Sequence, residues 1–425
     1  MSGTKIKNII ARQLVDCKCR PMVEVDVITE SGIFGRGSAP TGSSVGMYEA
    51  FILRDNDPSE YNGMSVHKAV RKVEDVVRPA LIGMDVTDQR AIDEKMIAMD
   101  GTPNKSNLGG NVIYSTSIAV LRAAANAAGV TAYRYLAGGD IKTVPVPSFN
   151  MINGGRYGDT VLAFNEFIVV PYKAEDISEA VHIGIRVFEK LNDVLAGYLG
   201  KEPVVGRSYG WAAPSDDPEV VLSLLEKAAA ACGYGNKVAF ALDCASSEMY
   251  DKNSNTYLLK GKRVSSEELV HYARGLSEKF PFLFIEDLLG EDDWDGFSAA
   301  VSQIERSIII GDDFMVTNLE RIRRAYDQKA IQGFILKPNQ VGSITEALDA
   351  YAFARRHNLA AVPSGRAGGV TDDIVMDLAV GLQVPFIKNG APRSGERIDK
   401  LNFLMRAASL YPDCRLADLS GIIKF

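Results

Sequence analysis

Three apolar segments in the second half of the chain end in carboxylates. KVAFALD ends in Asp243, FLFIED ends in Glu286 and Asp287, and SIIIGDD ends in Asp312 and Asp313. One acid after a buried segment is ordinary polar termination, but three successive endings of this kind predict a cluster of anions. Such a cluster is costly unless a cation neutralises it, and Mg²⁺ is the usual hard divalent ion bound by oxygens. Asp243, Glu286 and Asp312 are therefore candidate Mg²⁺ ligands.

Two lysines occupy matching positions in later segments. Lys337 ends GFILK, and Lys388 lies in FIKNG. Their ammonium groups could balance the acids without any metal, and this alternative stays open. A buried lysine that faces a metal ion could instead have its pKa lowered and act as a base. The chemistry would then be removal of a proton from the carbon next to a carboxylate, with the metal stabilising the enediolate.

These endings belong to a series of eight short apolar segments, each followed by polar residues. The segments are 146–152, 166–171, 237–243, 282–287, 307–313, 333–338, 360–364 and 386–390. Most of the later endings lie about 25 residues apart, the length of one strand, one helix and two short loops. One longer interval contains a hairpin-like insert at 250–263. Eight units predict a β/α barrel with its active site at the C-terminal strand ends, and the closely spaced first two segments predict an irregular start.

The N-terminal part of the chain has another pattern. MVEVDVIT, at 22–29, alternates apolar and polar residues as a half-buried strand does. Residues 66–81 and 115–129 carry apolar side chains at helical spacing. We therefore predict an α/β protein with an α+β domain over residues 1–140 and a β/α barrel over residues 141–425.

The overall composition excludes several classes of protein. The net charge of −7 argues against a nucleic-acid or anionic membrane partner. No apolar run reaches the roughly 18 residues of a membrane span, and the N-terminal residues lack the pattern of a secretory signal. The five scattered cysteines are typical of free thiols in a reducing cytoplasm. We expect a soluble cytoplasmic protein that holds any anionic ligand locally.

The motifs along the chain resemble those of the enolase family. The barrel segments FNMINGG, NEFIVVP, ALDCASSEMY, FIEDLLGEDDWDGF, IIGDDFMVTN, ILKPNQVGSITEALDA and IKNGAPRSGER are similar to the family's, and SAPTGSSVGMYEAFILRD resembles its mobile lid loop. The resemblance covers nearly the whole chain in order. It implies an enolase-type barrel behind an N-terminal lid domain, and a hydro-lyase, which is a carbon–oxygen lyase. It also implies Mg²⁺ with a lysine base, and a homodimer or larger homo-oligomer.

The resemblance also implies where the metals bind. Asp243, Glu286 and Asp312 match the ligands of the first Mg²⁺. Ser44, in the lid loop, matches a residue that helps to hold a second Mg²⁺ together with the substrate phosphate.

Further roles follow residue by residue from the same resemblance. Lys337 would be the general base, and Lys388 would hold the substrate carboxylate. Glu166 matches an active-site glutamate, and Arg366 matches an arginine that binds phosphate. Asp313 is expected to orient a neighbour such as Lys337.

Several positions close to this chemistry depart from the family pattern. They are Arg156, Tyr157, Arg207, Ser208, Gly365 and Ala367. The family's GDEGG reads GRSYG here, so Ser208 replaces the glutamate that acts as acid for the departing hydroxyl, and Arg207 replaces the preceding aspartate. A serine–histidine pair after INGG is Arg156 and Tyr157. SHRSGE reads SGRAGG, so Gly365 replaces the family's histidine.

These departures affect one half of the family's reaction. The parts that remove a proton are present, but the expected acid for the leaving hydroxide is absent, and general acid help contributes about 10²–10⁴-fold. Glu166 or Tyr157 is the candidate substitute. The added Arg156 and Arg207 favour a substrate with more negative charge than 2-phosphoglycerate, because arginine pairs well with carboxylate, phosphate and phosphonate oxygens.

Three functions stay open on this sequence. The first is a divergent enolase-like lyase that acts on a small phosphorylated or phosphonylated acid and eliminates water or another leaving group. The second is ordinary glycolytic phosphopyruvate hydratase, which converts 2-phosphoglycerate to phosphoenolpyruvate. The third is a non-catalytic enolase homologue that acts as a binding protein, although an idle site would not need three acids and two lysines.

Overall fold

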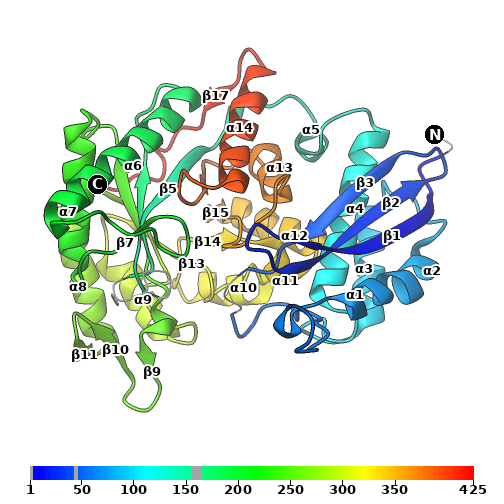
Figure 1. Cartoon of the computed structure of the whole chain (residues 1–425), viewed down its shortest axis with the longest axis horizontal. Coiled ribbons are helices and arrows are strands. Elements are labelled where there is room, and N and C mark those ends of the chain that lie inside the picture. The colour runs from blue at the N-terminus through cyan, green and yellow to red at the C-terminus, as the bar shows by residue number, and fades with distance from the viewer. Residues whose placement is uncertain (1–2, 43–45, 156–163) are drawn as a thin grey trace.

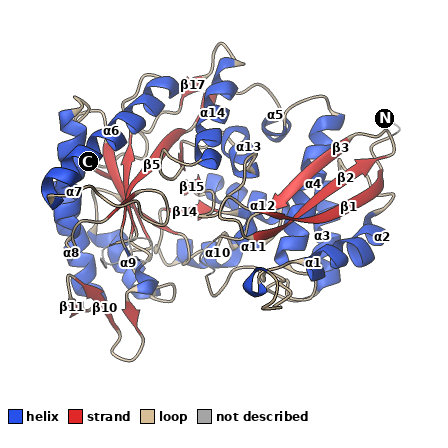
Figure 2. Ribbon diagram, viewed as in Figure 1, coloured by secondary structure: helices blue, strands red, loops and turns tan. Residues whose placement is uncertain are grey.

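The computed structural model describes residues 3–42, 46–155 and 164–425 of the 425-residue chain. Figure 1 shows two parts side by side, an N-terminal part coloured blue to cyan and a barrel coloured green to red. Figure 2 shows helices around the strands of the barrel, and helices beside the sheet of the N-terminal part. The predicted order, an α+β part followed by a β/α barrel, is confirmed.

The N-terminal part contains an antiparallel sheet covered by a long helix. Its strands are β1 (Ile6–Val15), β2 (Pro21–Thr29) and β3 (Phe34–Ala39), in that order. Its helices are α1 (His67–Lys72), α2 (Arg78–Leu81), α3 (Gln89–Asp100), α4 (Gly110–Ala127) and α5 (Ala132–Ala137). The helix predicted over 66–81 is therefore α1 and α2, joined through a π-helical turn at Val73–Val77.

The prediction that β2 is half-buried was wrong. Its polar residues Glu24 and Asp26 are also buried. Arg12 on β1 pairs with both carboxylates, and Arg36 on β3 donates from Nε to Asp26 Oδ1 at 2.7 Å. Because β2 is the central strand, its neighbours can supply cations that a pattern of alternating polarity does not reveal.

Two glycines of β3 allow α4 to pack closely against the sheet. A Cβ atom on Gly37 would lie 2.1 Å from the carbonyl oxygen of Ser115 and 2.7 Å from the amide nitrogen of Ala119. A Cβ atom on Gly35 would lie 2.2 Å from the carbonyl oxygen of Ala119. The backbone of α4 itself occupies this space, so no side-chain rearrangement can make room.

We therefore expect Gly37→Ala to lower the free energy of unfolding by about 1–3 kcal/mol, the usual effect of overpacking. Gly275→Ala is the matched control, because Gly275 lies in a helix with open space around its Cβ position, and this change should be neutral or slightly stabilising. Urea denaturation measures both. Equal stability of the two variants would contradict the close packing of α4.

The ring of the barrel has eight strands in the described residues, and a ninth strand, β7 (Trp211–Ala212), pairs with β5 beside the ring. In sheet order the strands of the ring are β5 (Val146–Asn153), β6 (Glu166–Val170), β8 (Ala239–Asp243), β12 (Phe282–Glu286), β13 (Ile308–Gly311), β14 (Gly333–Leu336), β15 (Ala360–Pro363) and β16 (Phe386–Lys388). A bridge between Ser364 and Lys388 closes the ring, and β16 pairs with β5. β6 runs antiparallel to both of its neighbours, which confirms the irregular start.

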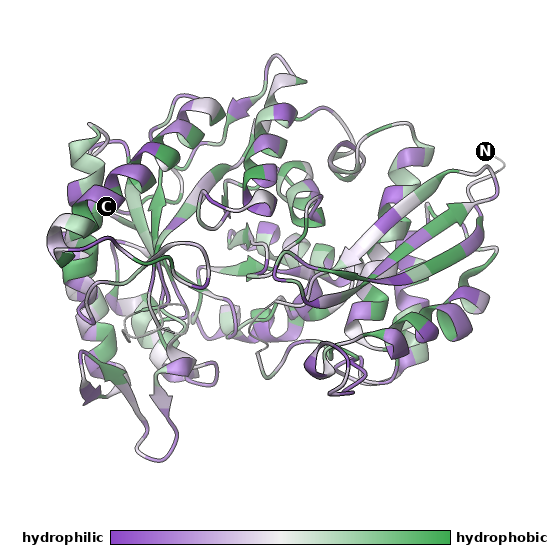
Figure 3. Ribbon diagram, in the orientation of Figure 1, coloured by the Kyte–Doolittle hydropathy of each residue, from purple (hydrophilic) through white to green (hydrophobic). Residues whose placement is uncertain are grey.

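Helices surround the barrel and connect successive strands. They are α6 (Ile177–Leu199), α7 (Pro218–Ala231), α8 (Ser266–Lys279), α9 (Trp294–Gln303), α10 (Leu319–Asp327), α11 (Pro338–Val341), α12 (Ile344–Arg356), α13 (Ile374–Gly381) and α14 (Gly395–Ser409). The predicted insert forms the small sheet of β9 (Tyr250–Asp251), β10 (Thr256–Leu259) and β11 (Lys262–Val264). In Figure 3 the central strands are mainly green, in keeping with their buried apolar side chains.

Buried contacts join the two parts of the molecule. Ser117 on α4 accepts a hydrogen bond from the backbone amide of Ile344, at the start of α12. Asp93 on α3 accepts bonds from the backbone amide and the hydroxyl of Thr345. Because these polar contacts are buried, the N-terminal part is held firmly against the barrel helices that follow β14.

Candidate active site

One cavity lies at the ends of the barrel strands and contains most of the predicted site residues. Its empty volume is about 700 Å³, part of it open to solvent. The predicted residues in its wall are Glu166, Ser208, Asp243, Asp312, Lys337, Arg366 and Lys388. Glu286 is fully buried beside them and contacts Lys388. The cavity is therefore strongly charged and lined by both signs.

The three predicted metal ligands come from neighbouring parallel strands. Asp243 ends β8 and lies opposite Glu286, the last residue of β12. Asp312 directly follows β13, which pairs with β12 on its other side. Parallel pairing brings the C-terminal ends of these strands to one rim of the barrel, as the sequence pattern predicts.

The two lysines lie among these carboxylates. The Nζ atom of Lys388 is 2.6 Å from Glu286 Oε2, 3.1 Å from Asp243 Oδ2 and 3.4 Å from Glu166 Oε2. The Nζ atom of Lys337 donates to Asp312 Oδ2. Each lysine therefore pairs with the acids in the described residues. This is the arrangement expected if the lysines balance the charge of the acids without a metal.

The balance of charge leaves room for a divalent cation. Four carboxylates, those of Glu166, Asp243, Glu286 and Asp312, meet two ammonium groups in these contacts. With Glu166 protonated, as its raised pKa favours, three carboxylates still exceed the two ammonium groups, and the all-oxygen donor set suits an ion such as Mg²⁺. The donor types of Asp243, Glu286 and Asp312 therefore suit the predicted metal, whereas the acids whose oxygens all lie within 4.8 Å of one another at this rim are Asp287, Asp312 and Asp313.

Burial and the neighbouring charges shift the pKa values of these groups. Burial, with Asp243 nearby, raises the pKa of Glu286 well above its ordinary value, and burial also raises the pKa of Glu166. Burial alone would lower the pKa of Lys337, but the adjacent Asp312 carboxylate outweighs it and the pKa is raised. The expectation of a lowered pKa for Lys337 therefore does not hold while Asp312 neutralises its charge.

Asp312 is held by residues that the sequence analysis did not identify in this role. Asp287 accepts hydrogen bonds from the backbone amides of Asp312 and Asp313, each at 2.8 Å. Gln340, on α11, donates to Asp312 Oδ1 at 2.8 Å. Asp287 and Gln340 thus orient Asp312, which pairs with Lys337, and the expected orienting role of Asp313 stays a prediction. The role of Asp287 could have been suspected from the sequence, because this acid directly follows Glu286. The role of Gln340 could not, because a glutamine in a helical segment is ordinary.

The predicted phosphate-binding arginine makes an ion pair with the N-terminal part. Arg366 donates from Nη1 to Glu49 Oε2 at 2.9 Å, and both side chains are buried. Glu49 also accepts from the backbone amide of Gly46. The second half of the lid loop therefore reaches the cavity wall, while Ser44 lies outside the described residues.

The positions that depart from the family pattern fall in different places. Ser208 is buried in the cavity wall, and its carbonyl and hydroxyl oxygens accept from Arg397 at 2.9 and 3.1 Å. Arg207 is exposed and is not part of the cavity wall. Arg156 and Tyr157 lie outside the described residues.

Glu166 is oriented by its strand and by an amide. It is the first residue of β6 and lies opposite Asp243 of β8. Asn150 donates from Nδ2 to Glu166 Oε1 at 2.9 Å. With a raised pKa and a place in the cavity wall, Glu166 can carry a proton more readily than an ordinary glutamate.

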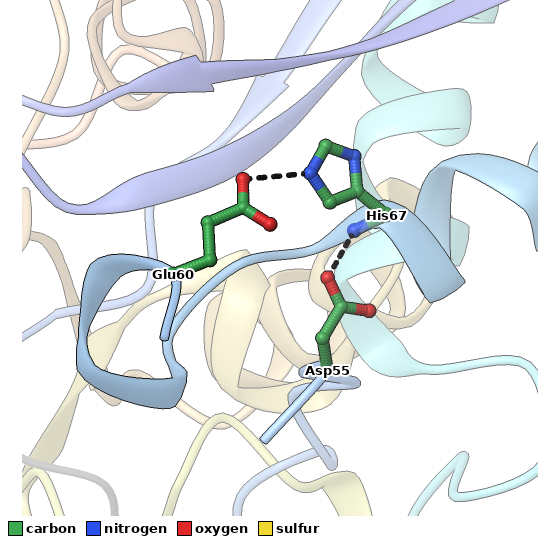
Figure 4. A group of neighbouring side chains, drawn as sticks. All are labelled: Asp55, Glu60 and His67. Carbon is green, nitrogen blue, oxygen red and sulfur yellow. Dashed lines mark hydrogen bonds and ion pairs between the residues drawn. The ribbon is translucent and has the colours of Figure 1, made fainter. Parts of the chain in front are cut away.

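A second group of potential metal ligands lies in the N-terminal part. Figure 4 shows Asp55, Glu60 and His67 close together. Asp55 accepts from the backbone amides of His67 and Lys68 at the start of α1, and Glu60 pairs with His67 Nε2 at 2.8 Å. Asp55 binds the first backbone amides of α1 and Glu60 pairs with the His67 side chain, so the group has an ordinary structural explanation.

The described helices include none that is long and apolar enough to cross a membrane.

Comparisons with known proteins agree with this architecture. Residues 6–136 match the family model described as the enolase N-terminal domain, and residues 141–412 match the enolase C-terminal TIM barrel domain. The chain is similar to the protein named Enolase from Methanocaldococcus jannaschii, with 41% identity over 403 residues, which cover 95% of this chain and 94% of that relative. The chain therefore belongs to the enolase family.

Proposed function

We propose that the chain is a Mg²⁺-dependent enolase-like lyase acting on a small phosphorylated or phosphonylated acid. It removes the proton next to the substrate carboxylate and forms an enol product by elimination of water or another leaving group. Membership of the enolase family implies the broader activity, that of a carbon–oxygen lyase. The observation that carries the proposal is the meeting of four carboxylates and two lysines in one cavity.

The metal would be held by the carboxylates at the strand ends. Asp243, Glu286 and Asp312 are the proposed ligands, and Ser44 is proposed for a second ion on the family resemblance alone. Bound Mg²⁺ supplies a Lewis acid that stabilises negative charge on the substrate carboxylate as the proton leaves.

The lysines would divide the work of proton removal and binding. Lys337 is the proposed base, because it lines the cavity next to Asp312, and it can accept a proton only in its neutral amine form. Lys388 would hold the substrate carboxylate, a role that suits a permanently charged group with a strongly raised pKa. Arg366, paired with Glu49, would bind the phosphoryl or phosphonyl group.

The leaving group needs a proton from another residue. Ser208 is a neutral hydroxyl that accepts from Arg397, so it cannot replace a carboxylic acid in this step. Glu166 is the proposed acid, since its raised pKa favours the protonated form. Tyr157 stays a candidate from the sequence.

Ordinary phosphopyruvate hydratase activity is the second candidate. The 41% identity to a relative named Enolase favours it, whereas Ser208 argues against it. Measuring turnover of 2-phosphoglycerate with Mg²⁺ separates the two, because an ordinary enolase should turn this substrate over at a normal rate. A divergent lyase should bind Mg²⁺ and an anionic ligand but turn over 2-phosphoglycerate poorly. A non-catalytic homologue should show no stabilisation by either.

Restoring the family's acid offers a direct test of specificity. The double change Ser208→Glu with Arg207→Asp should raise kcat/KM for 2-phosphoglycerate by about 10²-fold or more, the usual contribution of a general acid. Arg207→Asp alone is the control, because Arg207 is exposed and should contribute little. If the double variant is no faster than the control, specificity does not lie in this segment.

The family resemblance also supports a proposal about assembly and location. We expect a homodimer or larger homo-oligomer in the cytoplasm. Sedimentation at several protein concentrations tests the first of these expectations.

A further inference from the structure

The helix α14 places two additional cations in the wall of the cavity. Arg397 and Lys400 both line it, and each is only 4% exposed. Neither has a part in the proposed lyase chemistry. Burying a charged side chain is costly unless nearby groups compensate for the loss of water, so the burial of these two cations needs an explanation.

The ammonium group of Lys400 occupies space left by a glycine. A Cβ atom on Gly365 would lie 2.1 Å from Lys400 Nζ, so any side chain there would displace the ammonium. Among the described residues, Lys400 has one ion-pair partner, Asp373 Oδ2 at 3.5 Å, and makes no hydrogen bond. An ammonium group has three donors. The group therefore has donors to offer to a bound ligand.

Arg397 is oriented but only weakly neutralised. Its two terminal nitrogens donate to Ser208, which carries no charge, and the Glu396 carboxylate lies 3.5 Å from its Nε. Replacing a glutamate with Ser208 would leave this guanidinium charge available to other anions. The local arrangement is thus a cation held in place by a neutral acceptor.

An amide in the same wall also lacks partners. Asn389 is 2% exposed, and neither its Oδ1 nor its Nδ2 has a hydrogen-bond partner in the part of the chain that the structure describes. It follows Lys388 in the chain and lines the cavity with Arg397 and Lys400. Buried amides almost always have partners, so an unpaired one in a cavity wall that also contains two cations indicates that a polar ligand group belongs in this cavity.

We propose that Lys400 and Arg397 bind a second carboxylate of the substrate, in the part of the cavity bounded by Gly365 and Ser208. This proposal rests on the proposed lyase function and narrows its substrate class. The substrate would carry a phosphoryl or phosphonyl group and two carboxylates. The substrate's added negative charge, inferred from the sequence, would thus be bound by the two cations of α14. Arg207 is not its partner, because Arg207 does not line the cavity.

Two inert probes that differ by one carboxylate test this assignment. They are 3-phosphonopropanoate and (phosphonomethyl)malonate, and their affinities are measured by calorimetry with saturating Mg²⁺. The wild-type protein should bind the dicarboxylate about 10-fold or more tightly, the effect of one charge-assisted hydrogen-bonded pair. Lys400→Met should remove most of this preference and leave the affinity for 3-phosphonopropanoate within about 2-fold.

A second variant and a control protect the test against misfolding. Gly365→Ala should remove the same preference, because its Cβ displaces only the far end of a flexible side chain. Lys105→Met is the matched control, since Lys105 is also buried with one carboxylate partner, Glu346, but does not line the cavity. It should keep the preference.

The possible outcomes distinguish the two proposals. The carboxylate site would be overturned if the wild type bound both probes with equal affinity. It would also be overturned if Lys400→Met and Gly365→Ala lost affinity for both probes to the same extent. The lyase proposal would stand in either case. Failure of both probes to bind the wild type with Mg²⁺ would overturn the lyase proposal, and the carboxylate site with it.

Discussion

Replacing Lys337 with alanine should abolish exchange of the proton next to the carboxylate of 2-phosphoglycerate with solvent deuterium. In the wild type this exchange should outpace elimination, because the proposed base is present while Ser208 occupies the place of the acid. Loss of a general base lowers a rate by about 10²–10⁴-fold. Proton NMR in D₂O with Mg²⁺ follows the exchange directly.

The control for this variant concerns the metal. Lys337 pairs with Asp312, so its removal frees a carboxylate and should leave Mg²⁺ affinity unchanged or increased. Lys279→Ala, which changes an exposed lysine paired with Glu219, should exchange at the wild-type rate. Exchange at the wild-type rate in Lys337→Ala would remove this residue as the base.

Replacing Glu286 with glutamine should remove the stabilisation of the protein by Mg²⁺. At a concentration 100-fold above the dissociation constant, binding stabilises the wild type by about 2.7 kcal/mol. The variant should gain almost nothing, because a fully buried carboxylate ligand has become a neutral amide. Thermal denaturation with and without Mg²⁺ measures both proteins.

The metal-free proteins should differ in the opposite direction. The pKa of Glu286 is raised by burial in the folded state, so its charged form costs stability as pH rises above the unfolded-state value. At neutral pH without Mg²⁺, Glu286→Gln should therefore be at least as stable as the wild type. Glu189→Gln, at an exposed ion pair with Arg186, should respond to Mg²⁺ as the wild type does. If Glu286→Gln gains the full stabilisation, Glu286 is not a ligand.

Much of the barrel could be predicted from where apolar segments end. The segment 282–287 corresponds to β12, and 307–313 contains β13 and the two acids that follow it. Strand direction could not be predicted in this way, because an apolar pattern reads the same in either direction. The antiparallel course of β6 depends on how it pairs with β5 and β8, which is a tertiary property.

The site was predictable only where residues stand at strand ends. Asp243 and Lys388 are the last residues of buried strands, so their shared location comes from barrel geometry. Lys400 and Arg397 lie within α14, where charged residues are ordinary in a helix that has an exposed face. Their burial depends on the absence of a side chain at Gly365 and on the position of Ser208, and neither can be derived from helical periodicity.

The ion pair between Glu49 and Arg366 has a consequence for any anion that enters the cavity. The guanidinium already has a carboxylate belonging to the same chain, and an incoming phosphoryl group must share or displace it. The measured affinity for the anion then reflects the difference between the binding free energies of the phosphoryl group and of Glu49 to Arg366. A barrel expressed without residues 1–140 would lack this internal competitor, so Arg366 should hold simple phosphate more tightly.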